Sequence, residues 1–134
     1  MKQFPSAAHL VSWAGLCPEL KQSAGKRQRS RIRKGAPWLK PVLVQAAWAA
    51  VRNKECYYRS LFHRLRNRRG PKKAIVAVAG AILTAVFHIL TDGTFYQDLG
   101  PDHFNRLDRA RVSARLVRRL NSIGFDVQIR DLAA

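Results

Sequence analysis

Residues 74–90 form a run of 17 residues without a formal charge, although the chain of 134 residues carries a net charge of +17. The run is rich in alanine and also contains Gly80, Thr84 and His88. A helix that spans a membrane needs about 20 apolar residues, so this run is at the short limit for a span. Its length therefore predicts a helix in the core of a globular domain, with a membrane span as the alternative. In a core helix, His88 would be a buried histidine whose hydrogen bonds are satisfied inside the protein.

The rest of the composition is compatible with a single domain over residues 1–134. Hydrophobic residues make up 47% of the chain, which is enough to build a packed core. The two cysteines, Cys17 and Cys56, fit neither a disulfide framework nor a zinc site. Residues 1–11 lack the continuous apolar segment of a signal peptide. We therefore expect a protein of a reducing compartment, the cytoplasm.

Hydrophobic periodicity predicts three helices before this run. A short helix is expected over residues 4–13, with Ser6 as its N-cap. Residues 41–53 are helical in composition and apolar on nearly all sides, which predicts burial of most of that helix. Residues 57–68 carry one apolar stripe and a basic remainder, and Gly70 closes the helix. The stripe consists of Tyr58, Leu61, Phe62 and Leu65.

The C-terminal part combines a helix signal with a strand signal. Asp108 is a suitable N-cap for a helix that runs to Ser122, and Gly124 suits the position after that helix. Residues 125–130 alternate apolar and polar side chains, which is the pattern of a strand. A strand alone leaves its backbone groups unpaired, so this strand is expected to pair with residues 31–33 or with another chain or domain.

Together these elements predict a mainly α fold. It is a helical domain with a long basic loop over residues 17–36, a small β element and a helix–strand extension over residues 106–134. The loop has no sustained periodicity and leaves room only for short extended pieces. Residues 94–105 also lack periodicity and are expected to be irregular.

Basic residues outnumber acidic residues 25 to 8, and they gather in two clusters. Residues 21–40 hold eight Lys or Arg and no acid, and residues 52–73 hold nine with Glu55 as their single acid. Arginine supplies 17 of the 25, and its planar fork grips phosphate. A run of charges is usually a solvated face. Two clusters on either side of a buried helix are better explained by a surface that contacts nucleic-acid phosphates.

The candidate phosphate contacts come from both clusters. Aromatic residues lie in or beside the same two clusters, and the rings of Trp38, Tyr57 and Tyr58 could stack on bases. For Trp38 and Tyr58, packing in the core is the favoured role. The predicted nucleic-acid-binding residues are Lys21, Lys26, Arg27, Arg29, Arg31, Arg33, Lys34, Arg59, Arg64, Arg66, Arg68, Arg69, Lys72 and Lys73.

Ser23 lies between small residues inside the first basic cluster. A serine in such a loop could attack a phosphodiester, and nearby guanidinium groups would stabilise the extra negative charge at phosphorus. The spacing assigns it no general base. The residue types alone therefore favour an ordinary loop serine that bonds to the backbone.

Metal-assisted phosphoryl transfer needs several carboxylates that converge on Mg²⁺. Of the eight acids, Asp98 and Asp102 are close in sequence, whereas the others resemble caps, turns or surface positions. The four histidines form no ligand set, and nothing beside Tyr57 and Tyr58 supports a tyrosine nucleophile. We expect no metal site and no cofactor in this chain.

Three motifs occur in an order that resembles a known family. They are Trp-Ala-Gly-Leu-Cys-Pro at 13–18, Gln-Ser-Ala-Gly at 22–25 and Lys-Lys-Ala-Ile-Val-Ala-Val-Ala at 72–79. Together with Tyr-Gln-Asp-Leu-Gly at 96–100, they are similar to the C-terminal domain of bacterial insertion-sequence transposases of the IS110 (IS116/IS110/IS902) family. The resemblance covers roughly residues 4–127.

The resemblance implies DNA transposition by strand cleavage and rejoining, in some cases guided by an RNA that the element encodes. By motif, Ser23 would be the serine that attacks DNA, with Ser12 and Ser30 as competitors. The family pairs this domain with an N-terminal RuvC-like domain whose acidic DEDD set holds Mg²⁺, and that domain is absent from this sequence. The sequence also has Ala36 and Pro37 where many members have Gly-Asn.

These implications predict a truncated or split transposase that is inactive alone. Its partners would be DNA, guide RNA, and a second copy or a full-length transposase, in the bacterial cytoplasm at the nucleoid. Two other classes remain. One is a non-catalytic nucleic-acid-binding protein, such as a regulator of an intact transposase. The other is a membrane-surface protein that uses the basic amphipathic helix, although no membrane partner is expected.

Overall fold

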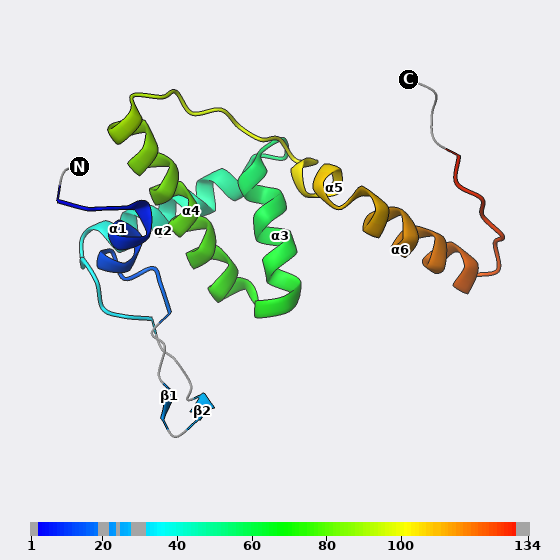
Figure 1. The fold of residues 1–134 in the computed structure, drawn as a ribbon, viewed down its shortest axis with the longest axis horizontal. Coiled ribbons are helices and arrows are strands. Elements are labelled where there is room, and N and C mark those ends of the chain that lie inside the picture. Colours follow the sequence, from blue (N-terminus) through cyan, green and yellow to red (C-terminus); the bar gives the residue numbers. More distant parts are fainter. Residues whose placement is uncertain (1–2, 19–21, 24, 28–31, 131–134) are drawn as a thin grey trace. The chain divides into compact units, whose positions relative to one another are not determined.

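The computed structural model describes residues 3–18, 22–23, 25–27 and 32–130. Within these ranges the chain forms six helices and one two-stranded hairpin, which confirms the mainly α fold (Figure 1). The chain divides into two compact units, Met1–Pro101 and Asp102–Ala134.

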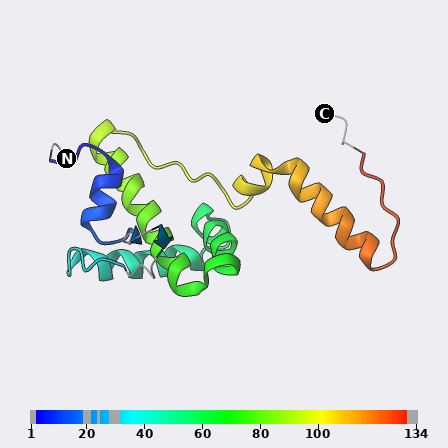
Figure 2. The ribbon, with the colours of Figure 1, turned by 60° about the horizontal axis from the view of Figure 1, so that its bottom comes forward.

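Helix α4, Pro71–Asp92, is the central helix of the first unit. It begins with proline at its first position and ends at Gly93, whose φ of 65° gives the left-handed conformation of a helix C-cap. It contacts α1, α2 and α3 (Figures 1 and 2). These contacts agree with the predicted core helix. Its buried residues are Ala74, Ile75, Val78, Ala79, Leu83 and Phe87.

By length and composition, α4 is also the single helix of the described residues that could cross a membrane. Within the first unit, 33% of its most apolar stretch is buried. A core helix passes the same test, so the length alone does not distinguish the two interpretations. His88 does not belong to the core as expected: its side chain is 55% exposed, and Nδ1 lies 3.0 Å from Oδ2 of Asp92 one turn later. Phe87 occupies the buried side instead.

Helices α1, Ala7–Trp13, and α2, Leu39–Arg52, pack against α4. Ser6 is the N-cap residue of α1, as predicted, although its hydroxyl bonds to Nδ1 of His9 at 2.8 Å instead of capping a backbone N–H. The expectation that α2 is buried on most sides is wrong. Its buried residues, Leu43, Ala47 and Val51, follow one stripe at i, i+4 and i+8, and the opposite face is exposed.

Helix α3, Tyr57–Arg69, packs against α4 through the predicted apolar stripe. Tyr58 and Phe62 are buried, and Leu61 and Leu65 are half-buried against the core. Gly70, with φ of 80° and ψ of 163°, ends α3 and directly precedes α4. Only glycine adopts this backbone region readily, so the sharp joint between the two helices depends on it.

The β structure of the described residues is a hairpin inside the basic loop and not the predicted pairing of residues 125–130 with residues 31–33. Strand β1, Gln22–Ser23, pairs antiparallel with β2, Lys26–Arg27. A single bridge between Pro18 and Ile32 lies closer to the helices.

The second unit contains α5, His103–Leu107, and α6, Arg109–Ser122. Helix α6 matches the prediction, with Asp108 as its N-cap residue. The short helix α5 corrects the expectation of irregular chain up to residue 105. The predicted strand over residues 125–130 does not form in the described part of the chain. The physical reason is that a strand needs a partner edge, and no described strand pairs with residues 125–130; in the segment proposed as the partner, Ile32 forms an isolated bridge with Pro18.

Candidate nucleic-acid interface

Ser23 is the last residue of β1, and its backbone is paired with that of Lys26. Gly25 lies in the turn between them with φ of 74°, and a Cβ placed there would meet no atom within 4 Å. Ser23 therefore sits at an open turn, opposite an exposed lysine. Arg27 is the last residue of β2. Lys21, Arg29 and Arg31 lie outside the described residues.

Arg33 and Lys34 are exposed where the loop returns to the helices. The Nζ of Lys40 donates a hydrogen bond to the carbonyl oxygen of Arg33 at 3.1 Å. Lys40 is the second residue of α2, so this bond ties the end of the basic loop to the start of that helix. The structure thus adds Lys40 to Arg33 and Lys34 as a cation at the end of the basic loop.

The joint between α3 and α4 brings together a second group of cations. Arg66, Arg68 and Arg69 lie in the last turn of α3, and Lys72 and Lys73 lie in the first turn of α4. All five are exposed. The arginines are favourable at the negative end of the α3 dipole, whereas the lysines are at the positive end of α4, which has no acidic residue in its first turn. A bound phosphate would relieve that repulsion. We name these five residues the basic joint.

Arg59 and Arg64 differ in their surroundings. Arg59 is half-buried, and its Nη1 donates to the carbonyl oxygen of Val51 at 3.2 Å. That carbonyl is among the last four of α2, which lack partners within the helix. Arg59 therefore links α3 to the end of α2, while Arg64 is exposed on α3.

Asp98 is a structural centre whose role the sequence analysis missed. Its Oδ1 accepts from the backbone N–H groups of Tyr57 at 2.9 Å and Gly100 at 2.7 Å. Its Oδ2 accepts from Sγ of Cys56 at 3.1 Å and from the Tyr96 hydroxyl at 3.0 Å. Asp98 thus caps α3 from the chain that follows α4. The Asp-x-Gly spacing predicts the Gly100 bond, but nothing local reveals the contacts across about 40 residues of chain.

These contacts set the charge of the groups around Asp98. Partial burial opposes its ionisation, but the hydrogen bonds from Tyr57, Gly100, Cys56 and Tyr96 outweigh this and hold its pKa below the usual range. Burial raises the pKa of the Cys56 thiol, which therefore stays protonated and able to donate.

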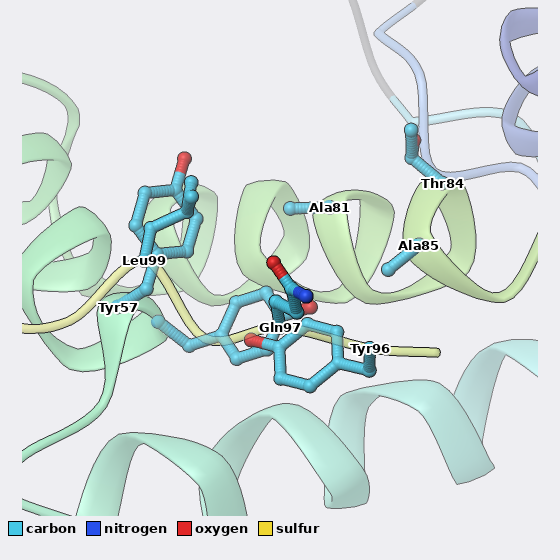
Figure 3. A pocket seen from close by; sticks show the side chains of 8 residues that line it. Tyr57, Ala81, Thr84, Ala85, Tyr96, Gln97 and Leu99 are labelled. Atoms are coloured by element: carbon cyan, nitrogen blue, oxygen red, sulfur yellow. The ribbon is translucent and has the colours of Figure 1, made fainter. Parts of the chain in front are cut away.

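Three tyrosines meet beside this carboxylate. The rings of Tyr58 and Tyr96 stack with centroids 5.9 Å apart, and Tyr57 lies edge-on to Tyr58 at 5.6 Å. They line an open hollow of about 350 Å³ together with residues of α4 and the segment after it (Figure 3). Burial raises the pKa of Tyr57, Tyr58 and Tyr96. All three are therefore neutral phenols at neutral pH.

Replacing Asp98 with alanine should lower the free energy of unfolding by about 1 kcal/mol at pH 7, the usual value of a lost helix cap. A depressed carboxyl pKa stabilises the fold above the unfolded value of about 3.9 and loses that effect as pH falls through the folded value. The difference between wild type and Asp98→Ala should therefore shrink from pH 5 to pH 3 in urea unfolding.

Asp98→Asn is the matched control, because its amide oxygen can keep both backbone bonds on the Oδ1 side. The free energy of unfolding of Asp98→Asn at pH 7 should lie between those of the wild type and Asp98→Ala. It should lack the change near pH 4 that the Asp98 carboxylate gives the wild type. A constant difference between wild type and Asp98→Ala across the pH range would contradict the assigned role of the carboxylate.

No three His, Cys, Asp or Glu side chains gather into a possible metal site among the described residues. In particular, the two carboxylate oxygens of Asp98 already accept four hydrogen bonds from groups of the protein. The donors present here therefore do not fit a magnesium site.

Residues 1–63 match the model of the Transposase IS116/IS110/IS902 family. This region holds the motif around Ser23, the basic loop and the start of α3. The match relates this part of the chain to the insertion-sequence transposases of the IS116/IS110/IS902 family, as the sequence motifs indicated.

A curated relative extends the similarity beyond that region. The chain is 34% identical over 100 residues to an uncharacterized 43.6 kDa protein of insertion element IS110 from Streptomyces coelicolor. The aligned part covers 73% of this chain and 24% of the relative, so the chain spans about a quarter of that protein's length. No solved structure matches the chain.

Proposed function

We propose that this chain is the DNA-binding, serine-bearing part of an insertion-sequence transposase. The observation that carries the proposal is the family match over residues 1–63, which includes Ser23 and the basic loop. Support also comes from the exposed cations at Arg33, Lys34 and the basic joint. The partner is DNA, with guide RNA as a second nucleic acid, and the protein works in the bacterial cytoplasm at the nucleoid.

In this function Ser23 is the nucleophile. Its Oγ loses a proton and bonds to phosphorus, one ester P–O bond to deoxyribose breaks, and the released oxygen takes up a proton. The cations of the loop stabilise the added negative charge on the phosphoryl oxygens. The open turn at Gly25 supports this role, because a phosphate can approach the backbone there without a steric obstacle.

The active enzyme is a composite. In this proposal the acidic metal-binding part is an N-terminal RuvC-like domain, as the family resemblance implies, which a full-length transposase associated with this chain could supply. Alone, the chain would bind DNA without cleaving it. A role as a regulator of an intact transposase follows from the same association and would differ in lacking the serine chemistry.

Replacing Ser23 with alanine should abolish the covalent protein–DNA adduct in a reconstituted enzyme and leave DNA affinity within about twofold, because one hydroxyl adds little to a charge-dominated surface. The measurement is denaturing electrophoresis of labelled DNA, with a binding titration in parallel. Ser12→Ala in α1 is the control and should keep the adduct. Loss of DNA binding in Ser23→Ala would identify a structural serine, and an adduct that persists would exclude it as the nucleophile.

A further inference from the structure

An exposed pair of tryptophans lies where α1 meets the start of α2. Trp38 is 67% exposed and Trp13 is 48% exposed. Their ring centroids are 6.3 Å apart with an edge-on angle of 70°, and the ring of Phe4 contacts Trp13 with a centroid distance of 5.5 Å. This overturns the expected core position of Trp38. A tryptophan this exposed leaves most of its ring in water, which is unfavourable unless a partner covers it.

Two glycines fix the geometry of this pair. A Cβ on Gly35 would lie 2.4 Å from the carbonyl oxygen of Ala14 and 2.5 Å from the Cα of Gly15. The same approach leaves Gly15 no room for a side chain, since its Cβ would lie 2.7 Å from the Cα of Gly35. The backbone after α1 is therefore pressed against the backbone before α2. The tryptophans flank this contact, so their relative position is set before any ligand binds.

Three cations lie close to Trp38 in the sequence. Arg33 and Lys34 precede Gly35 and are exposed, and Lys40 is held to the Arg33 carbonyl at 3.1 Å. Residues 20–54 contain no acidic side chain at all. An apolar ring face among cations suits a ligand that carries both a flat π surface and a negative charge. An unpaired nucleotide has both, whereas the bases of a duplex have their faces covered by their neighbours.

We infer that the Trp13–Trp38 pair is a stacking platform for an unpaired nucleobase, with Arg33, Lys34 and Lys40 on the flanking phosphates. This inference rests on the proposed nucleic-acid function and adds a preference for single-stranded segments. Strand exchange must expose such segments. The basic joint, which has charge but no exposed aromatic ring, makes the contacts that do not distinguish single from double strands.

The platform is tested with the full chain and two fluorescein-labelled probes, a 15-nucleotide thymidine strand and a 15-base-pair duplex. Trp38→Ala should weaken single-strand binding by roughly 5- to 150-fold, the usual effect of one lost stacking contact, and change duplex binding by less than about twofold. Trp38→Phe should recover most of the loss. Trp48→Ala is the matched control: Trp48 is 44% exposed on α2 but packs on Phe62, and its removal should leave the preference between probes unchanged.

The outcomes distinguish failure of the stacking platform from failure of the proposed nucleic-acid function. Unchanged single-strand affinity in Trp38→Ala, with salt-dependent binding of both probes by wild type, would overturn the platform and leave the proposed function standing. An equal loss on both probes would also overturn it, since Trp38 would then act through the fold. If wild type binds neither probe at low salt, both fail.

A second measurement does not depend on the stability of an alanine variant. In a Trp13→Phe, Trp48→Phe protein, Trp38 is the single tryptophan, since the sequence contains three. Saturating the thymidine strand should quench its fluorescence strongly, and the duplex should not. Equal quenching by both probes would contradict stacking.

Discussion

Gly35→Ala should be the most destabilising of the small substitutions in the first unit. Two costs add at this position. A non-glycine residue at φ of 57° costs about 1–2 kcal/mol. In addition, the new Cβ would lie 2.4 Å from a backbone carbonyl, where no flexible side chain can move aside. Forced shifts in packed structure cost typically 1–3 kcal/mol, so we expect a loss of about 2–5 kcal/mol.

Gly93→Ala is the matched control for this experiment. Gly93 has φ of 65°, close to that of Gly35, but a Cβ there would meet nothing within 4 Å. It should therefore show the conformational cost alone, about 1–2 kcal/mol. Urea unfolding of both variants gives the difference. If the two lose the same stability, the close approach of Gly15 and Gly35 is not present in solution.

The elements with one clear apolar stripe were predictable from sequence. The stripe of α3 identifies a helix and the side of it that is buried. The uncharged run of α4 identifies a helix but not its buried side, since His88 lies on the exposed side. In α2 the sequence is apolar all round, so it predicts a helix but not the buried face. The three-dimensional contacts decide that Leu43, Ala47 and Val51 face the core.

Two sites were out of reach of sequence reasoning because they join distant segments. The sequence pairs Asp98 only with the nearby Asp102, whereas its contacts with Cys56 and Tyr57 form because α4 returns the chain to the start of α3. Trp38 looks like a core residue because tryptophan usually packs inside, and only the approach of Gly15 to Gly35 places its ring at the surface beside Trp13.

The strand predicted over residues 125–130 shows the reverse error. Alternation alone states which side chains share a face, but a strand also needs a partner edge. Within the described residues the two strands of the hairpin pair with each other, and no strand pairs with residues 125–130. The alternating pattern therefore shows that the segment could form a strand, but it is not evidence that a strand forms.

The affinity of the chain for duplex DNA should fall by roughly 10²- to 10³-fold between 50 and 200 mM salt. Each phosphate that a cation neutralises releases condensed counterions, and about five such contacts give this slope. The basic joint supplies five exposed cations from two helices within one unit. Fluorescence anisotropy of a labelled duplex at several salt concentrations gives the slope directly.

A pair of variants matched in charge locates these contacts. Replacing Arg68, Arg69, Lys72 and Lys73 with glutamine removes four charges from the basic joint. The control replaces Arg111, Arg115, Arg118 and Arg119 of α6 with glutamine, which removes four charges from the second unit. The first variant should reduce the slope of log affinity against log salt by about 3.6, whereas the control should keep the wild-type slope. An equal reduction in both would mean that DNA responds to the total charge of +17 and not to the basic joint.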